Sequence, residues 1–314
     1  MLQYGMKEYA ELENQMVAVE RILEYIDLDN ERGDGANLTS KWPTNGQIDF
    51  STVSLRYNPN VPSVLKQITF TINSNDKIGI VGRTGAGKSS LISVLFRLFD
   101  FEGDISIDGI NTKTIPLHTL RSKISIIPQE PVLFSCSVRK NLDPYDEYQD
   151  SHLWNALEDV KIREMIASLP AGLSTKLTEG GQNLSVGERQ LLCLARAIVK
   201  MNKIIILDEA TANVDLETED LIKNAISKKF KMCTVMTIAH RIHTVMDCDK
   251  VLVMGDGRVL EYDSPSKLLQ DTKGAFYGLV HLKNNDGTYT ILKGVLQEHL
   301  PSKFKTALIV LVLV

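Results

Sequence analysis

The pattern Gly82-x4-Gly87-Lys88-Ser89 contains residue types that could bind a phosphate group. Its glycines, which include Gly85, would let successive backbone N–H groups curl around an anion without a Cβ clash. Lys88 is then expected to contact the β- and γ-phosphates of a nucleotide, and the Ser89 hydroxyl to ligate Mg²⁺. The alternative is an ordinary glycine turn before a helix.

Two adjacent acids, Asp208 and Glu209, follow the apolar run of residues 203–207. Such a run is typical of a parallel strand that is buried on both faces. Two carboxylates at its end are hard to explain by structure alone, because an unpaired buried charge is costly. Beside a phosphate loop, Asp208 would hold Mg²⁺ and Glu209 would point at the water that attacks the γ-phosphorus.

Two further polar residues follow predicted strands. Gln129 lies between Pro128 and Pro131, which keep it out of regular structure after the strand at residues 124–127. His240 ends the apolar run that starts at Cys233. Ligands of open α/β sheets bind at strand ends, so both side chains are candidates for the same site. A hydrogen bond to backbone is the alternative for His240.

The helix start at Ser185 and the side chain of Tyr57 could each have either a structural or a binding role. Ser185 and Glu188 have the spacing of a capping box, which would simply start the apolar helix at residues 191–199. The same helix start could instead bind an anion with its N–H groups and dipole. Tyr57, just before a turn, could pack in the core or offer a ring face for stacking with adenine.

The elements around these residues predict an α/β fold. Residues 77–82 are predicted to form a strand and residues 88–99 a helix, which is the context that a phosphate-binding loop requires. A hairpin is predicted at residues 250–262 and a helical insertion at 141–177, with Trp154, Leu157, Ile162 and Ile166 facing inward. Other strands are expected at residues 48–57, 68–72, 104–108, 124–127, 203–208 and 233–239.

Composition limits the class of protein. The 314 residues have a net charge of −4 and no basic patch, so nothing favours nucleic acid as a partner. The four cysteines form no Cys-x-x-Cys pair, which argues against a disulfide framework or a zinc site and for a reducing, cytosolic setting. No apolar run approaches the roughly 20 residues that span a bilayer. We expect a helix at residues 1–28, a linker at 29–46 and a weakly ordered tail at 284–314.

Taken in order, these pieces resemble a known domain. Residues 47–283 resemble the nucleotide-binding domain of ATP-binding-cassette (ABC) transporters, and in particular the second such domain of the multidrug-resistance-associated (C) subfamily. Residues 13–25 resemble the cytoplasmic end of the last transmembrane helix in these transporters. The motifs that carry the likeness are Leu184–Gln190 (signature), Gln129 (Q-loop), His240 (switch histidine), Tyr57 (adenine stacking) and Ala212–Asp215 (dimer-interface loop).

The resemblance implies a P-loop NTPase core with a mostly parallel sheet, an antiparallel β subdomain and a helical signature subdomain. It implies ATP and Mg²⁺ as cofactors, with Glu209, His240 and Gln129 in catalysis and Ser89, Gln129 and Asp208 at the metal. It places Tyr57, Gly82, Arg83, Thr84, Gly85, Ala86, Gly87, Lys88, Ser89 and Ser90 at the domain's own nucleotide, and Leu184, Ser185, Val186, Gly187 and Glu188 at the nucleotide of a partner domain.

The implied function is the motor of an exporter of organic anions or conjugates, at the cytoplasmic face of the plasma membrane. Its expected partners are a second nucleotide-binding domain, transmembrane domains and a small-molecule substrate; by itself the chain would be only the motor fragment. Val186 and Glu188 replace the glycine and glutamine of the commonest signature, which suggests a weakly hydrolytic signature face. The alternatives are a soluble ABC ATPase, a regulatory ATP-binding domain with little turnover, and a kinase or GTPase, which would leave the signature unexplained.

Overall fold

The computed structural model describes residues 2–27, 31, 42–208, 214–239 and 242–281. The chain divides into one unit of residues 1–33 and a second of residues 34–314. The first unit contains helix α1 (Leu2–Ile26), where the sequence predicts a helix. Its apolar side chains, among them Leu12, Met16 and Leu23, are exposed. Most of the predicted linker, Glu209, His240 and the predicted tail lie outside the described residues.

Two β-sheets organise the second unit, which confirms the predicted α/β class. The antiparallel sheet has the order β2-β1-β4-β5. The larger sheet has the order β10-β9-β3-β8-β7-β6, in which β9 to β6 are parallel and β10 forms the predicted hairpin with β9. The strands are β1 (Ile48–Leu55), β2 (Leu65–Ile72), β3 (Lys77–Gly82), β4 (Phe101–Ile107), β5 (Ile110–Asn111), β6 (Ile124–Ile127), β7 (Ile204–Asp208), β8 (Thr234–Ile238), β9 (Lys250–Gly255) and β10 (Arg258–Asp263).

Helix α2 (Lys88–Leu95) packs into the core that the two sheets share. It is shorter than the helix to Phe99 that the apolar spacing predicts. Arg97 has a φ of +51°, a left-handed conformation that a helix cannot continue through. The helix therefore ends at Leu95, and the chain turns so that Phe99 packs against the ring of Tyr57.

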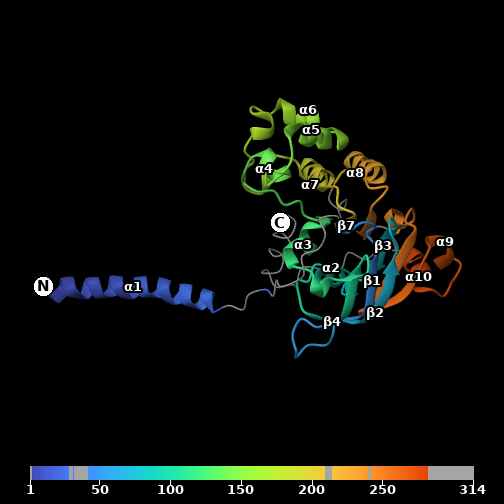
Figure 1. Ribbon diagram of the computed structural model, residues 1–314, viewed down its shortest axis with the longest axis horizontal. Coiled ribbons are helices and arrows are strands. Elements are labelled where there is room, and N and C mark those ends of the chain that lie inside the picture. The colour runs from blue at the N-terminus through green and yellow to red at the C-terminus, as the bar shows by residue number, and fades with distance from the viewer. Residues whose placement is uncertain (1, 28–30, 32–41, 209–213, 240–241, 282–314) are drawn as a thin grey trace. The chain divides into compact units, whose positions relative to one another are not determined.

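A second core holds the helices together, and Figure 1 shows α4, α5 and α6 grouped at one end of this unit, away from the sheets. Of the predicted inward face, Leu157, Ile162 and Ile166 are buried and Trp154 is half-buried. The helices are α3 (Leu117–Ser122), α4 (Val138–Leu142), α5 (Asp150–Asp159), α6 (Arg163–Ser168), α7 (Val186–Lys200), α8 (Leu216–Lys229), α9 (Pro265–Leu268) and α10 (Ala275–His281). Short 3₁₀ turns lie at Thr112–Thr114, Gly172–Ser174, Glu179–Gly181 and Ile242–Val245.

The last residues of the predicted linker are part of the folded unit. Trp42 is 5% exposed, and its indole N–H donates to the carbonyl of Ile107 at 3.1 Å. Asp108, at the β4–β5 turn, accepts hydrogen bonds from the backbone N–H groups of residues 44–47 at 2.7 to 3.2 Å. The composition of this stretch predicts a linker, but composition reflects only the local sequence. The partners that hold residues 42–47 in the fold lie more than 60 residues away along the chain.

The carboxylate of Asp108 is expected to make the free energy of unfolding depend on pH. Burial raises its pKa, but the N–H groups of Asn45, Gln47, Gly46 and Thr44 lower it more, so the net pKa lies below the ordinary 3.8. A depressed folded-state pKa contributes stability above the unfolded-state pKa, and that stability is lost as pH falls through the folded-state value. Asp108→Asn, which tolerates the left-handed φ of +49°, is expected to lower the free energy of unfolding by about 1–3 kcal/mol near neutral pH.

Urea unfolding of the wild-type chain and Asp108→Asn at several pH values measures this effect. The difference between the two proteins should stay constant from neutral pH down to about pH 5 and shrink as the pH falls below the ordinary pKa of 3.8 and through the lower folded-state pKa of Asp108. A difference that does not shrink below the ordinary pKa would show that the carboxylate charge contributes nothing.

Candidate functional site

Parallel pairing brings the polar strand ends to one edge of the larger sheet. Ile80 of β3 pairs with Ile238 of β8, and Ile238 pairs with Asp208 of β7. Since neighbouring strands are about 4.8 Å apart, Asp208 lies about 10 Å from β3, next to the edge where the phosphate loop begins. Gln129 follows β6, two residues beyond Ile127, and is exposed at the same edge.

The loop between β3 and α2 has a backbone that only glycine adopts readily. Gly85 has a φ of +80° with open space around its Cα, and Gly87 has a φ of +97° at the N-terminus of α2. A Cβ on Gly87 would lie 2.8 Å from Leu65. Backbone N–H groups at a helix start with this geometry favour an anion.

The Lys88 ammonium lies inside this loop. Lys88 is 6% exposed, and its Nζ donates to the carbonyls of Gly82 at 2.9 Å and Arg83 at 3.2 Å. A buried ammonium is costly unless it is hydrogen-bonded, so the loop carbonyls satisfy it in this conformation. The charge is thereby held where a phosphate bound by the loop would meet it.

Tyr57 is hydrogen-bonded to helix α2, which follows the phosphate loop. Its hydroxyl donates to Ser90 Oγ at 2.8 Å, and its ring lies 4.7 Å from that of Phe99 at an angle of 83°. Tyr57 is nonetheless 40% exposed, so part of the ring is accessible. The position is compatible with both the packing role and the stacking role, and adenine stacking stays a prediction.

The residues predicted at Mg²⁺ are of the type that this ion prefers. A hydroxyl from Ser89, a carboxylate from Asp208 and an amide from Gln129 are hard oxygen donors, and Mg²⁺ needs only one or two protein ligands besides phosphate oxygens and waters. All three residues come from the same sheet edge, Ser89 and Gln129 being exposed and Asp208 half-buried. Among the described residues, no three His, Cys, Asp or Glu side chains form a metal-binding cluster.

The signature segment starts α7 with a complete capping box. The Ser185 hydroxyl accepts from the N–H of Glu188 at 3.2 Å, and the Ser185 N–H donates to the Glu188 carboxylate at 2.7 Å. The structural alternative from the sequence is therefore confirmed, and it does not exclude a binding role for this exposed helix start. Gly187 lies against α8, because a Cβ there would be 3.0 Å from Thr218 Oγ1.

The remaining predicted site residues differ in accessibility. Leu184 is 6% exposed and belongs to the helical core, so its side chain contributes to packing and not to a binding surface. Val186 is 39% exposed at the start of α7. Arg83 is exposed, Thr84 half-buried, and Ala86 and Ser90 buried.

Sequence reasoning missed the contacts of two buried polar residues of α7, Arg196 and Gln190, the latter being the last residue of the signature motif. Gln190 Nε2 donates to the carbonyl of Pro128 at 3.0 Å, next to Gln129. Arg196 is 4% exposed, and its guanidinium donates to oxygens of Val132 and Asn141. Arg196 interrupts the apolar run at residues 191–199, and this was the available signal, whereas Gln190 directly precedes that run.

The comparison with protein families agrees with this geometry. Residues 65–212, which include the phosphate loop, the signature segment and Asp208, match the family described as ABC transporter. We refer to this matched stretch, a little under half of the chain, as the ABC domain. The predicted fold, a nucleotide-binding core with antiparallel β and helical parts, is confirmed by this match and by the sheet topology.

Known ABC proteins are similar over most of the chain. It is 51% identical over 306 residues to the probable multidrug resistance-associated protein lethal(2)03659 of Drosophila melanogaster, covering 95% of this chain and 22% of that protein. It is 53% identical over 282 residues to human ATP-binding cassette sub-family C member 4, covering 89% and 21%. The chain thus spans about a fifth of the length of these relatives.

A solved structure is similar to the ABC domain as well. A bacterial Atm1-family ABC exporter with ATP bound matches with a TM-score of 0.75 and 30% identity, over 86% of this chain and 47% of that one. Within the described part of the chain, no helix has the length and hydropathy to cross a membrane.

Proposed function

We propose that the ABC domain is the second, C-terminal motor domain of an exporter of the multidrug-resistance-associated type. Its work would be to bind and hydrolyse ATP with Mg²⁺ and to power transport of organic anions or conjugates across the plasma membrane from its cytoplasmic face. The observation that carries the proposal is the common sheet edge that contains the phosphate loop with Lys88 after β3, Asp208 at the end of β7 and Gln129 after β6. The identity to sub-family C proteins supports the exporter type.

In this proposal each nucleotide lies between two domains. This domain supplies the phosphate loop with Lys88, and another domain supplies a signature helix that closes the site and excludes water. Ser89, Gln129 and Asp208 would hold Mg²⁺, which neutralises charge on the phosphates. Glu209 would orient the attacking water, and His240 would lie near the γ-phosphate.

Glu188 places a negative charge at the start of the signature helix, on the surface that would contact the nucleotide of the partner domain. Its carboxylate is held at the start of α7 by the Ser185 N–H, so its negative charge would face the γ-phosphate bound by the partner domain. Like charges repel, and this repulsion is expected to weaken hydrolysis at that second site. The site built on Lys88 and Glu209 would then be the more active one.

An association experiment tests the proposal. The chain is mixed with a first nucleotide-binding domain of a sub-family C transporter, and sedimentation is measured with and without MgATP. We expect a heterodimer that forms with MgATP and dissociates after hydrolysis. Hydrolysis at an undiminished rate by this chain alone would favour the soluble ATPase alternative, and MgATP binding without turnover would favour the regulatory one.

Glu188→Gln is the matched variant in the same assay. Glutamine can still accept the hydrogen bond from the Ser185 N–H, so the capping box survives while the charge is removed. We expect a severalfold higher rate of ATP hydrolysis in the assembled pair. An unchanged rate would show that the Glu188 charge does not restrain the second site.

A further inference from the structure

A side-chain hydrogen bond joins the first residue of the Gln129 loop to the signature helix. Gln190, in the second turn of α7, is 1% exposed, and its Nε2 donates to the carbonyl of Pro128 at 3.0 Å. Pro128 directly precedes Gln129, and residues 128–136 form no helix or strand. The loop that carries Gln129 therefore takes support from α7 at its first residue.

The same helix holds the loop again further along. Arg196, less than two turns beyond Gln190, donates from Nη1 to the carbonyl of Val132 at 3.4 Å and from Nε to the carbonyl of Asn141 at 2.7 Å. Its Nη2 donates to Asn141 Oδ1 at 3.3 Å. Since both side chains are buried, these bonds are shielded from competing water.

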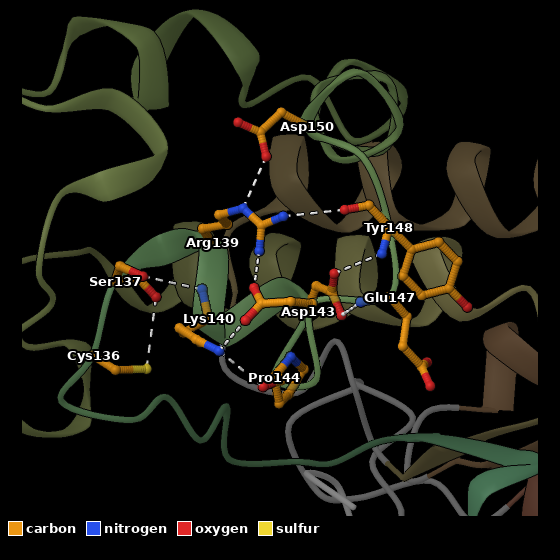
Figure 2. Close-up of polar contacts among 10 residues, drawn as sticks. Cys136, Ser137, Arg139, Lys140, Asp143, Pro144, Glu147, Tyr148 and Asp150 are labelled. Carbon is orange, nitrogen blue, oxygen red and sulfur yellow. Dashed lines mark hydrogen bonds and ion pairs between the residues drawn. The ribbon is translucent and has the colours of Figure 1, made fainter.

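The far end of the loop is fixed by local contacts. Asn141 is fully buried and exchanges hydrogen bonds with the backbone of Phe134 and Ser137. Figure 2 shows the guanidinium of Arg139 between Asp150 and the carbonyl of Tyr148. Arg139 donates to Asp150 at 2.8 Å and to the Tyr148 carbonyl at 3.1 Å, and it is also bonded to Asp146. Movement of the loop at Gln129 is therefore not absorbed at its α4 end.

We propose that Gln190 is a positioning residue that couples the Gln129 loop to the signature helix. A nucleotide that displaces Gln129 moves Pro128, and the bond to Gln190 passes this displacement to the first turn of α7, where Ser185 and Glu188 lie. The nucleotide held by one domain thereby adjusts the signature that the same domain presents to its partner. This inference rests on the proposed function, which places Gln129 at the nucleotide.

The hydrogen bonding of Gln190 suits a coupling role better than a stabilising one. Its Oε1 is buried and has no hydrogen-bond partner among the described residues. The amide thus gains one bond to Pro128 and leaves one acceptor unpaired, and these two effects oppose each other in the free energy of folding. Gln190→Met, similar in length and without polar atoms, should remove the coupling while the domain still folds.

Hydrogen exchange of the full chain, with and without the Mg²⁺ complex of the non-hydrolysable analogue AMP-PNP, measures the coupling. In the proposed function the signature residues contact the nucleotide of a different domain. A nucleotide bound to this chain alone therefore does not contact them, and any change in their exchange rate is transmitted through the fold. We expect AMP-PNP to slow exchange both at residues 128–136 and in the first turns of α7. In Gln190→Met the slowing of exchange at residues 128–136 should persist. The slowing in the first turns of α7 should be about fivefold smaller than in the wild type, which corresponds to the contribution of one hydrogen bond.

Leu191→Met is the matched control, because it changes a neighbouring buried side chain of α7 at nearly constant volume. It should respond to AMP-PNP like the wild type. A wild-type response of α7 in Gln190→Met, or an equal loss in Leu191→Met, would overturn the inference. If Gln190→Met does not fold, Gln190→Asn, whose amide is one methylene too short to reach Pro128, replaces it. Failure of the wild type to bind AMP-PNP would overturn the proposed function, whereas binding without any α7 response would overturn only the coupling.

Discussion

Replacement of Glu209 by glutamine is expected to lower the rate of ATP hydrolysis by about 10²- to 10⁴-fold, the usual contribution of a general base. Glutamine is nearly the same size but cannot accept a proton from the attacking water. In the sequence Glu209 directly follows Asp208, and Asp208 ends β7 at the edge that contains the phosphate loop. ATP affinity should change little, because Lys88, the residue that we propose to contact the phosphates, is unchanged.

Steady-state phosphate release and equilibrium ATP binding, both measured on the assembled transporter, separate the two effects. Glu217→Gln is the control, since Glu217 is an exposed carboxylate on the nearby helix α8. It should leave both quantities unchanged. If Glu209→Gln hydrolyses ATP at the wild-type rate, another group activates the water; if it also abolishes ATP binding, Glu209 is a binding residue.

Replacement of Lys88 by methionine is expected to weaken ATP binding by at least about 100-fold, because charge-assisted hydrogen bonds to the phosphates contribute about 1.5–3 kcal/mol each. Methionine preserves the length and the helix propensity of the side chain. The free protein should stay folded, since the loss of the hydrogen bonds to the carbonyls of Gly82 and Arg83 is offset by removal of a charge whose burial is costly.

The thermal midpoint with and without MgATP measures this effect. A ligand at about 100 times its dissociation constant stabilises the folded state by about 2.7 kcal/mol, so the wild type should show a clear rise in midpoint. Lys88→Met should show almost none at the same ATP concentration, and Lys113→Met, at an exposed lysine of the β4–β5 region, should behave like the wild type. A wild-type rise in Lys88→Met would mean that the loop does not hold the phosphates through Lys88.

The sequence was sufficient for features whose cause is local. The apolar strand before Asp208, the glycine pattern around Lys88 and the capping box at Ser185 each depend on neighbours within a few residues. Parallel pairing then brings the strand ends together, so the common edge also follows once the strands are known.

Other features depend on contacts between distant segments and could not be predicted from local patterns. Helix α2 ends early because of the left-handed conformation of Arg97, although apolar spacing continues to Phe99. Trp42 belongs to the core through a partner 65 residues away, and Gln190 reaches Pro128 across 62 residues. A polar residue in or next to an apolar helical segment indicates that such a contact exists, but it does not identify the partner residue.

The position of β3 in its sheet has a consequence for biosynthesis. Both neighbours of this strand come much later in the chain, because Lys77 pairs with Val235 and Ile78 with Lys250. A nascent chain that has reached only Lys229 contains the phosphate loop, the signature helix and Asp208, but β3 has no strand on either side. Long-range strand pairing of this kind forms slowly, since a large loop must close first. The nucleotide edge is therefore completed only after β8 and β9 have left the ribosome, and until then the apolar edges of β3 and β7 are exposed to chaperones and to aggregation.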